Sequence, residues 1–460
     1  MNSHSKISSL VYVIALTQFA MPFMFSGVGI TLPLMGVELH ASAVALGLIE
    51  TGYLGAVTAF LLPVGRLADA TDKKTLFKVG LLGYGLLTLS IGFASSPALI
   101  ITLRIIQGVF GAMVMATGMA LITEVVAKEN LGKAMGLSIG AIYAGLAAGP
   151  FIGGIITSSF GWRWVYFMTG VVLLLSFLLT HTLMNSQWKR PQMKVDWLGS
   201  AAVIAIIICL IAGSAILDET HWGGVLLVVG LISIPVFFWI EKRVDQPLLR
   251  FDRLRSNAVL SNALLSQLLM YSGSFGMTFL YSLYLQEVKA LSPQEAGQIL
   301  VIGPVLMAIT APLFGRLADR VQPTKITLAG IISTAISLMM ATQVGADTSL
   351  VYICTTIILQ GLGFAMFSSP NMTMIMSSVA AEHYSMASAL ASKTRYLGMV
   401  ISMVIITLLM SSLIGVGTIR ASLDRYLSVM QYSFVAFSVL SLVGVTLMIK
   451  LIAQHATKHS

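Results

Sequence analysis

Long apolar stretches follow one another along nearly the whole chain, and they constrain its fold more than any other feature. A helix needs about 20 apolar residues to cross a bilayer, and in lipid the helix satisfies its own backbone N–H and C=O groups. Charged residues make up only 10% of the 460, whereas soluble domains carry about 25%. The sequence therefore predicts an all-α polytopic membrane protein. It excludes a soluble enzyme, a nucleic-acid-binding protein and a disordered scaffold.

Fourteen apolar segments, separated by charged or Gly- and Pro-rich residues, are predicted to be transmembrane helices. They cover residues 9–37, 43–65, 76–95, 97–124, 134–158, 164–184, 197–217, 223–240, 257–286, 294–315, 325–344, 349–375, 387–414 and 428–452. The first is too long for the core of a signal peptide. With fourteen spans both termini lie on one side, and 20 of the 27 Lys and Arg fall in loops on that side, against 4 on the other. Because excess basic residues mark cytoplasmic loops, we expect a protein of the cytoplasmic (inner) membrane with both termini cytoplasmic.

An internal repeat indicates how these helices are organised. Gly65-Arg-Leu-Ala-Asp69 recurs as Gly315-Arg-Leu-Ala-Asp319, and Ile106–Met113 matches Leu359–Met366, at offsets of 250 and 253 residues. Matching segments in the same order and at nearly the same offset indicate two parallel six-helix repeats. Two helices are inserted between the repeats, which gives a 6+2+6 arrangement. Transporters that work by alternating access are built from such repeats, with the binding site near the membrane midplane at the repeat interface.

The repeat divides the chain into an N-terminal six-helix bundle (1–190), two inserted helices with cytoplasmic linkers (191–256) and a C-terminal six-helix bundle (257–460). The sequence shows no nucleotide-binding loop, nucleophile motif or metal-ligand spacing. We therefore expect no enzyme activity, no metal and no cofactor, with a proton gradient as the energy source. The expected partners are a small-molecule substrate and membrane lipids, not nucleic acid, and the chain is expected to be monomeric.

Four segments carry a resemblance to a known family. Gly65–Lys74, Leu103–Ala112, Gly145–Gly154 and Gly161–Trp164 resemble signature segments of the major facilitator superfamily. Over its whole length the chain looks like the fourteen-helix drug:proton antiporters within that superfamily. The resemblance implies secondary active transport by alternating access, with efflux of small organic or drug-like compounds coupled to protons.

The resemblance also implies two conformational elements. The first is a cytoplasmic latch that forms in one access state and breaks in the other; its residues are Gly65, Asp69, Gly315 and Asp319. Gly65 would allow close helix approach, and Asp69 would face an Arg or a helix N-terminus. The second is a bend that favours export, at Gly149, Pro150 and Gly153. The alternatives are a topological anchor without a conformational role, and the ordinary enrichment of Gly and Pro in membrane helices.

The chain departs from the family pattern at Met24, nine residues before Pro33, where the family commonly has Asp. Glu50 is the strongest remaining candidate for proton coupling. It lies about two turns, roughly 10 Å, inside the membrane from the outer end of its helix, and an intramembrane carboxylate is a functional candidate by default. Arg104 lies at the same depth in its own helix, so the two are predicted to pair, and movement of the guanidinium would switch the proton on or off. A fixed structural ion pair, or a Glu50 that reaches outer water, is the alternative.

Other residues have two interpretations each. Glu124, near a cytoplasmic helix end, is either a second coupling carboxylate or a packing residue at that end. Lys393 and Arg395 either meet an anionic substrate group or extend to the inner interface. An adaptable apolar substrate cavity is predicted to include Met24, Phe25, Tyr271 and Phe275. Two further functions stay open: a dedicated transporter of one metabolite, an anionic one included, and a membrane sensor or scaffold that does not transport.

Overall fold

A computed structural model describes residues 3–184, 197–218, 220–241, 243, 257–318, 320–380 and 384–456. Within these ranges, side chains are not described at 3–8, 69, 70, 128, 129, 197, 384, 385 and 454–456. All regular elements of this described part are helices. The all-α fold predicted from the apolar segments is therefore confirmed.

Thirteen helical segments of the described part are long and apolar enough to cross a membrane. The helices are α1 (Ser3–Glu38), α2 (Ala43–Ala70), α3 (Lys73–Gly92), α4 (Pro97–Val125), α5 (Lys128–Phe160), α6 (Arg163–Leu183), α7 (Trp197–Ala215), α8 (His221–Glu241), α10 (Ala258–Ser274), α11 (Gly276–Leu283), η1 (Tyr284–Val288), α12 (Pro293–Leu300), α13 (Ile302–Ala318), α14 (Pro323–Ala341), α15 (Leu350–Ser377), α16 (Tyr384–Leu413), η3 (Arg420–Ser422) and α17 (Leu423–Ala456).

Two predicted helices are interrupted in the structure. The segment expected as one helix at 257–286 consists of α10, α11 and the π-helical turn η1, with a break at Phe275. After the break, the Gly276 N–H donates to the Ser402 hydroxyl of α16 at 2.9 Å, so a side chain from another helix satisfies that backbone group. The segment expected at 294–315 is divided into α12 and α13 at Val301.

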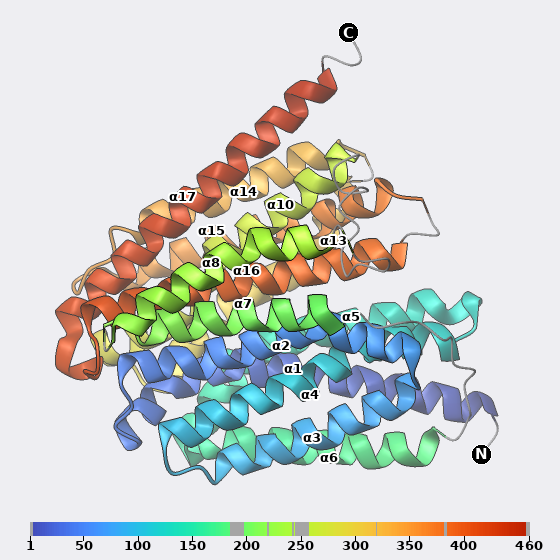
Figure 1. Ribbon diagram of the computed structural model, residues 1–460, viewed down its shortest axis with the longest axis horizontal. Helices are drawn as coiled ribbons and strands as arrows, with labels where there is room; N and C mark the ends of the chain where they lie inside the picture. Colours follow the sequence, from blue (N-terminus) through green and yellow to red (C-terminus); the bar gives the residue numbers. More distant parts are fainter. Residues whose placement is uncertain are drawn as a thin grey trace. The chain divides into compact units, whose positions relative to one another are not determined.

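The chain forms two compact units. Unit 1 comprises Met1–Leu248 and Leu291–Gln298, and unit 2 comprises Leu249–Ala290 and Ile299–Ser460. In unit 1, α1 packs against α5 and α6, α2 against α4 and α7, and α3 against α4 and α6 (Figure 1). In unit 2, α10 packs against α16 and α17, α13 against α15, and α14 against α15 and α17. The second set of pairings repeats the first, helix for helix, apart from the α2–α7 contact.

The repeat extends to the helix caps. The Ser96 hydroxyl accepts a hydrogen bond from the Leu99 N–H at the start of α4, at 3.3 Å. The Ser349 hydroxyl accepts one from the Tyr352 N–H at the start of α15, also at 3.3 Å. Such caps satisfy backbone donors that the first turn of a helix leaves free. Equivalent serines therefore fix where the two equivalent helices begin.

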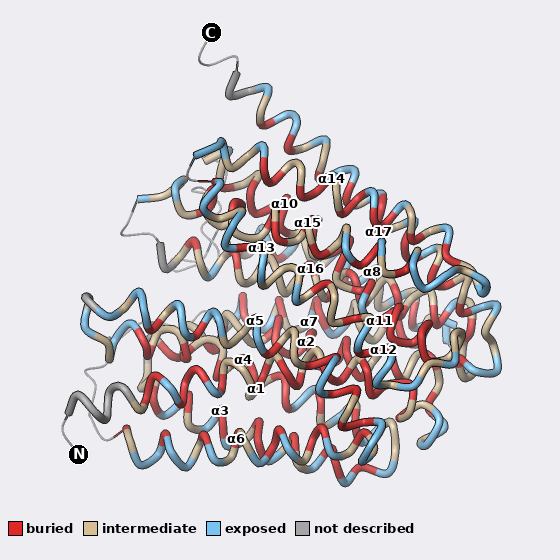
Figure 2. Tube along the Cα trace, turned by 180° about the vertical axis from the view of Figure 1, so that it is seen from behind, coloured by how far each residue is buried: buried red, intermediate tan, exposed pale blue. Residues whose placement is uncertain are grey.

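Helix α6 shows how side chains are distributed in a membrane bundle. Its exposed side is apolar and includes Trp164, Met168 and Leu175, whereas its buried side includes Tyr166 and Thr169. Figure 2 shows buried and exposed residues alternating along this helix. Because lipid solvates the apolar side, polar side chains of α6 are placed towards the inside of unit 1.

The contact between α1 and α5 depends on glycine. A Cβ atom at Gly149 would lie 2.8 Å from the Gly27 nitrogen and 2.9 Å from the Phe23 carbonyl oxygen, and it would overlap the Ser26 hydroxyl. Gly149→Ala should therefore push the two helices apart and lower the free energy of unfolding by about 1–3 kcal/mol. The thermal unfolding midpoint of the purified protein measures this.

Gly140→Ala, on the same helix, is the matched control. A Cβ atom at Gly140 would meet no atom of unit 1 within 4 Å, so this variant should unfold at the wild-type temperature. Equal midpoints for the two variants would show that α1 and α5 do not need glycine at their contact.

Candidate functional site

Glu50 of α2 and Arg104 of α4 meet inside unit 1. The Arg104 Nη2 atom lies 3.4 Å from the Glu50 Oε2 atom, and the exposed fractions of the two side chains are 0% and 6%. Helix α2 begins at Ala43 and α4 at Pro97, so each residue lies seven positions into its helix. The pairing that this equal depth predicts is present in the structure.

Arg104 is also held by groups other than Glu50. Its Nε atom donates to the Ile49 carbonyl oxygen at 3.2 Å, and its Nη1 atom donates to the Gln107 side-chain oxygen at 2.9 Å. The guanidinium carbon lies 4.3 Å from the centroid of the Tyr53 ring, a cation–π arrangement. A buried charge is costly unless it is paired and hydrogen-bonded. Arg104 would therefore keep most of its partners if Glu50 became neutral.

A polar network continues from Arg104 into α3. The Gln107 amide donates to the Thr88 hydroxyl at 2.7 Å, and the Thr88 hydroxyl donates to the Tyr84 carbonyl oxygen at 2.6 Å. The Tyr84 hydroxyl in turn reaches the Tyr53 hydroxyl at 3.4 Å. All four residues are buried. The network joins α2, α3 and α4 around the charged pair.

These four network residues are not among those predicted from the sequence, although the sequence contains part of the signal. Gln107 follows Arg104 by three residues, and Tyr53 follows Glu50 by three, spacings that place side chains on one face of a helix. Thr88 and Tyr84 are four residues apart on α3 for the same reason. Which face of α3 meets Arg104 depends on helix packing, and no spacing in the sequence reveals it.

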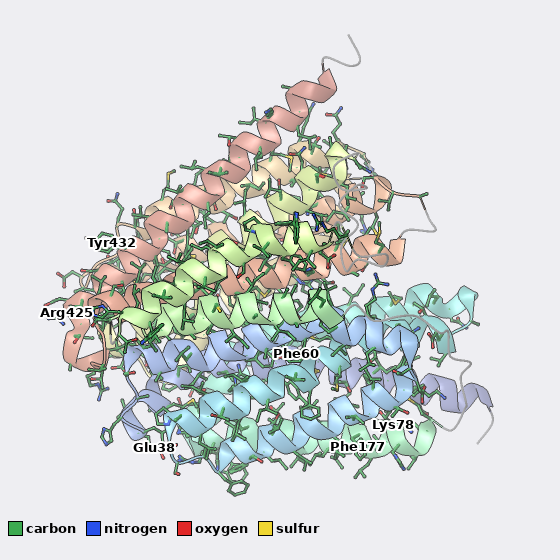
Figure 3. The ribbon with its side chains drawn as sticks, in the orientation of Figure 1. Glu38, Phe60, Lys78, Phe177, Arg425 and Tyr432 are labelled. Atoms are coloured by element: carbon green, nitrogen blue, oxygen red, sulfur yellow. The ribbon has the colours of Figure 1, made fainter. Side chains whose placement is uncertain are left out.

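A second polar cluster joins the end of α1 to the start of α6. Glu38 forms an ion pair with Arg163, and the Trp162 indole N–H donates to the Glu38 Oε2 atom at 2.7 Å. Figure 3 labels Glu38 and Lys78 at opposite ends of unit 1. The predicted orientation places the Glu38 end outside, so this cluster would close the outer ends of two helices.

Glu124 pairs with Lys73 at the other end of α4. The Lys73 Nζ atom lies 2.5 Å from the Glu124 Oε1 atom, and about a quarter of each side chain (26%) is exposed. Along α4, Glu124 is twenty residues from Arg104, which corresponds to roughly 30 Å. The structure therefore does not bring Glu124 to the Glu50–Arg104 pair. Instead, the ion pair between Glu124 and Lys73 joins the end of α4 to the start of α3.

Two of the predicted cavity residues belong to unit 1. Met24 has no exposed surface and packs only against protein in this conformation. Phe25 is half-buried, and its ring centroid lies 5.9 Å from that of Tyr53, the ring that also covers Arg104. The Tyr53 ring thus lies in contact with both Phe25 and Arg104.

The other predicted cavity residues belong to unit 2. The Tyr271 ring meets the Phe364 ring edge to face, with centroids 5.1 Å apart, and Phe275 stands at the break between α10 and α11. Lys393 and Arg395 are half-buried on α16. Tyr271 lies on α10 and Phe275 directly follows that helix, whereas Lys393 and Arg395 lie on α16, which packs against α10.

The latch residues are only partly described. The side chain of Asp69 and the whole of Asp319 lie outside the described residues. A Cβ atom at Gly315 would lie 2.8 Å from the Ser369 hydroxyl, whereas one at Gly65 would meet no atom of unit 1 within 4 Å. Within unit 1 no neighbouring helix comes that close to Gly65, so the close helix approach proposed there stays a prediction.

Gly149, Pro150 and Gly153 lie in an uninterrupted helix. Helix α5 runs from Lys128 to Phe160 through Pro150, and a Cβ atom at Gly153 would lie 3.4 Å from the Gly27 Cα atom of α1. In unit 2 the position equivalent to Gly149 is Ser402, which binds the backbone at the break before α11. The two units therefore differ here: unit 1 has close glycine packing, whereas in unit 2 a serine accepts a backbone hydrogen bond where the helical pattern is interrupted.

Comparison with known proteins assigns the chain to a family. The model described as Major Facilitator Superfamily matches residues 14–196 and 263–460, which include most of both units. The chain belongs to the Major Facilitator Superfamily. This result confirms the resemblance carried by the four signature segments, and it makes the chain a multi-pass membrane transporter.

Individual superfamily members support the same assignment. The tetracenomycin C resistance and export protein of Streptomyces glaucescens is 28% identical over 395 residues, which cover 84% of this chain and 73% of that protein. The puromycin resistance protein of Streptomyces alboniger is 28% identical over 384 residues, covering 81% and 75%. A crystal structure of a peptide transporter with sulfate bound has the same fold, with a TM-score of 0.72, 13% identity and 98% of each chain covered.

In this superfamily transporter the contact between Glu50 and Arg104 is a long one, and Arg104 has further partners in Ile49 and Gln107. The hydrogen bond between Glu50 and Arg104, at 3.4 Å, is longer than the 2.7–2.9 Å typical of charge-assisted bonds. Burial disfavours the charged form of a carboxyl group, and a neighbouring guanidinium favours it. A small movement between α2 and α4 would therefore change which form is stable.

Proposed function

We propose that this transporter exports small organic, drug-like compounds in exchange for protons, with Glu50 as the residue that carries the coupling proton. The supporting observation is the Glu50–Arg104 pair, buried within two apolar helices. Ionisable side chains at such depth are expensive and mark ion or proton pathways. The proton gradient supplies the energy, and no cofactor takes part.

The direction and the substrate class rest on the relatives. The two Streptomyces relatives described above are named for resistance, to tetracenomycin C and to puromycin, and the first is also named for export. The aromatic side chains Phe25, Tyr271 and Phe275 suit apolar ring compounds, and Lys393 and Arg395 suit a substrate with an anionic group. The protein would act as a monomer in the inner membrane, with both termini cytoplasmic.

Coupling requires that the two access states differ in their affinity for the proton. In one state Arg104 lies close to Glu50 and favours the carboxylate; in the other the pair is looser and the neutral acid is favoured. If the pKa of Glu50 differs by three units between the two access states, the difference is worth about 4 kcal/mol. That free energy is large enough to drive a compound uphill, because each tenfold concentration ratio costs about 1.4 kcal/mol.

Reconstituted protein tests this proposal. Proteoliposomes with an acidic interior should accumulate puromycin or tetracenomycin C when the outside is made alkaline, and a pH dye should report proton release from the interior. A protonophore should abolish the accumulation, and liposomes without protein should show none. Accumulation that is driven by sodium, or that ignores the pH gradient, would contradict proton coupling.

A further inference from the structure

The Tyr166 hydroxyl group is buried and poorly satisfied. Tyr166 has no exposed surface, and its hydroxyl finds no partner of normal geometry among the described residues, even though Thr31 lies beside it. Thr31 donates its own proton to the Val28 carbonyl oxygen at 2.7 Å. An unsatisfied buried hydroxyl costs about 1–3 kcal/mol. A group of this kind is explained if it is bonded in another state of the protein.

The Tyr166 ring is held firmly in place. It packs edge to face against the Trp162 ring, with centroids 5.8 Å apart and an interplanar angle of 87°. Trp162 is fixed in turn by its hydrogen bond to Glu38 at the end of α1. Tyr166 therefore lies one turn of α6 further in than the outer cluster, and its hydroxyl cannot easily move elsewhere.

The charged groups within electrostatic range of this hydroxyl are Arg104 of α4 and Glu50 of α2, and the Tyr84 hydroxyl of α3 is also in range. A poorly satisfied hydroxyl oxygen thus lies within electrostatic range of the charged pair.

The guanidinium has an N–H group to offer when Glu50 becomes neutral. Arginine has five N–H donors and no acceptor. The Nε and Nη1 atoms of Arg104 remain bonded to Ile49 and Gln107, whereas Nη2 is the atom that faces Glu50. Protonation of Glu50 weakens this last contact and leaves the Nη2 side of a buried cation in need of an acceptor.

We propose that Tyr166 is a positioning residue for proton coupling: its hydroxyl oxygen accepts a hydrogen bond from Arg104 when Glu50 takes up its proton. This inference rests on the proposed role of Glu50. No proton moves to or from Tyr166, which only stabilises the arrangement in which Glu50 is neutral. Without this bond, the protonated state of Glu50 is less favourable and forms only at lower pH.

Infrared titration of the full-length protein in lipid nanodiscs tests this without a substrate. The protonated Glu50 carboxyl band is identified as the band that Glu50→Gln removes. Tyr166→Phe keeps the ring and removes only the hydroxyl. It should lower the pH midpoint of the Glu50 band by about one unit, the equivalent of one hydrogen bond to a charged group, while leaving the unfolding temperature unchanged or higher.

Tyr426→Phe is the matched control, because it removes an equally buried tyrosine hydroxyl from unit 2. That hydroxyl donates to the Leu280 carbonyl oxygen at 2.6 Å, so its loss should lower stability and leave the Glu50 midpoint unchanged. A wild-type midpoint in Tyr166→Phe would overturn the role of Tyr166 and leave that of Glu50 intact. If the wild-type protein shows no titrating band that depends on Glu50, the proposed coupling itself is wrong.

Discussion

Replacing Glu50 by glutamine is expected to abolish uphill transport of the two probe antibiotics while their downhill exchange continues. Glutamine has nearly the same shape as a protonated glutamate and cannot ionise, so the site would remain in its proton-loaded form. Arg104 would stay in place, because Ile49 and Gln107 still accept its hydrogen bonds. The loss should be complete, since no free energy from the proton gradient would reach the substrate.

The measurement is accumulation against external pH in proteoliposomes, with counterflow of labelled antibiotic as the readout for downhill exchange. Glu295→Gln is a suitable control: Glu295 accepts hydrogen bonds from Ser292 in an exposed helix cap, and glutamine also suits that cap position. If Glu50→Gln still concentrates the antibiotic with the wild-type pH profile, Glu50 is not the coupling residue. Glu124 would then be the next carboxylate to replace.

The Glu50–Arg104 pair illustrates what sequence alone can establish about this site. The apolar runs that begin at residues 43 and 97 locate the two helix starts, and counting seven residues from each start gives the same depth. Depth restricts possible partners strongly in a membrane bundle, where helices run roughly parallel. The count does not reveal which side chains surround the pair, since this requires the rotation of each helix about its axis. For that reason the sequence does not single out Tyr166.

The break at Phe275 illustrates the opposite case. The sequence Gly273-Ser-Phe-Gly276 contains two glycines, but glycine is common in membrane helices and rarely interrupts them. The group that binds the free Gly276 N–H is the Ser402 hydroxyl, 126 residues further along the chain. A break that depends on so distant a partner leaves no local signal, so the apolar run predicts one helix. The all-α fold itself needs only the apolar runs, and it was predicted correctly.

Removing the positive charge with Arg104→Met should destabilise the protein more strongly as the pH rises. At low pH Glu50 is neutral, and the variant loses only the hydrogen bonds of Arg104 to Ile49 and Gln107. At higher pH the folded protein must either bury an unpaired carboxylate or keep its proton, whereas the unfolded chain releases that proton freely. The unfolded state then binds fewer protons than the folded state, so stability falls with increasing pH. Breaking a buried ion pair in this way costs about 3–5 kcal/mol.

The double variant Arg104→Met with Glu50→Gln separates the two contributions. It has no carboxyl group to ionise, so its unfolding temperature should not show the additional fall with pH that the single variant shows. It should nevertheless remain less stable than wild type at every pH, because the Gln107 side-chain oxygen still lacks its donor. Thermal unfolding of purified wild type, both single variants and the double variant across a pH series measures this coupling. If Arg104→Met and the double variant follow the same pH dependence, Glu50 does not depend on Arg104 for its charge, and the pair is a fixed structural contact rather than a proton switch.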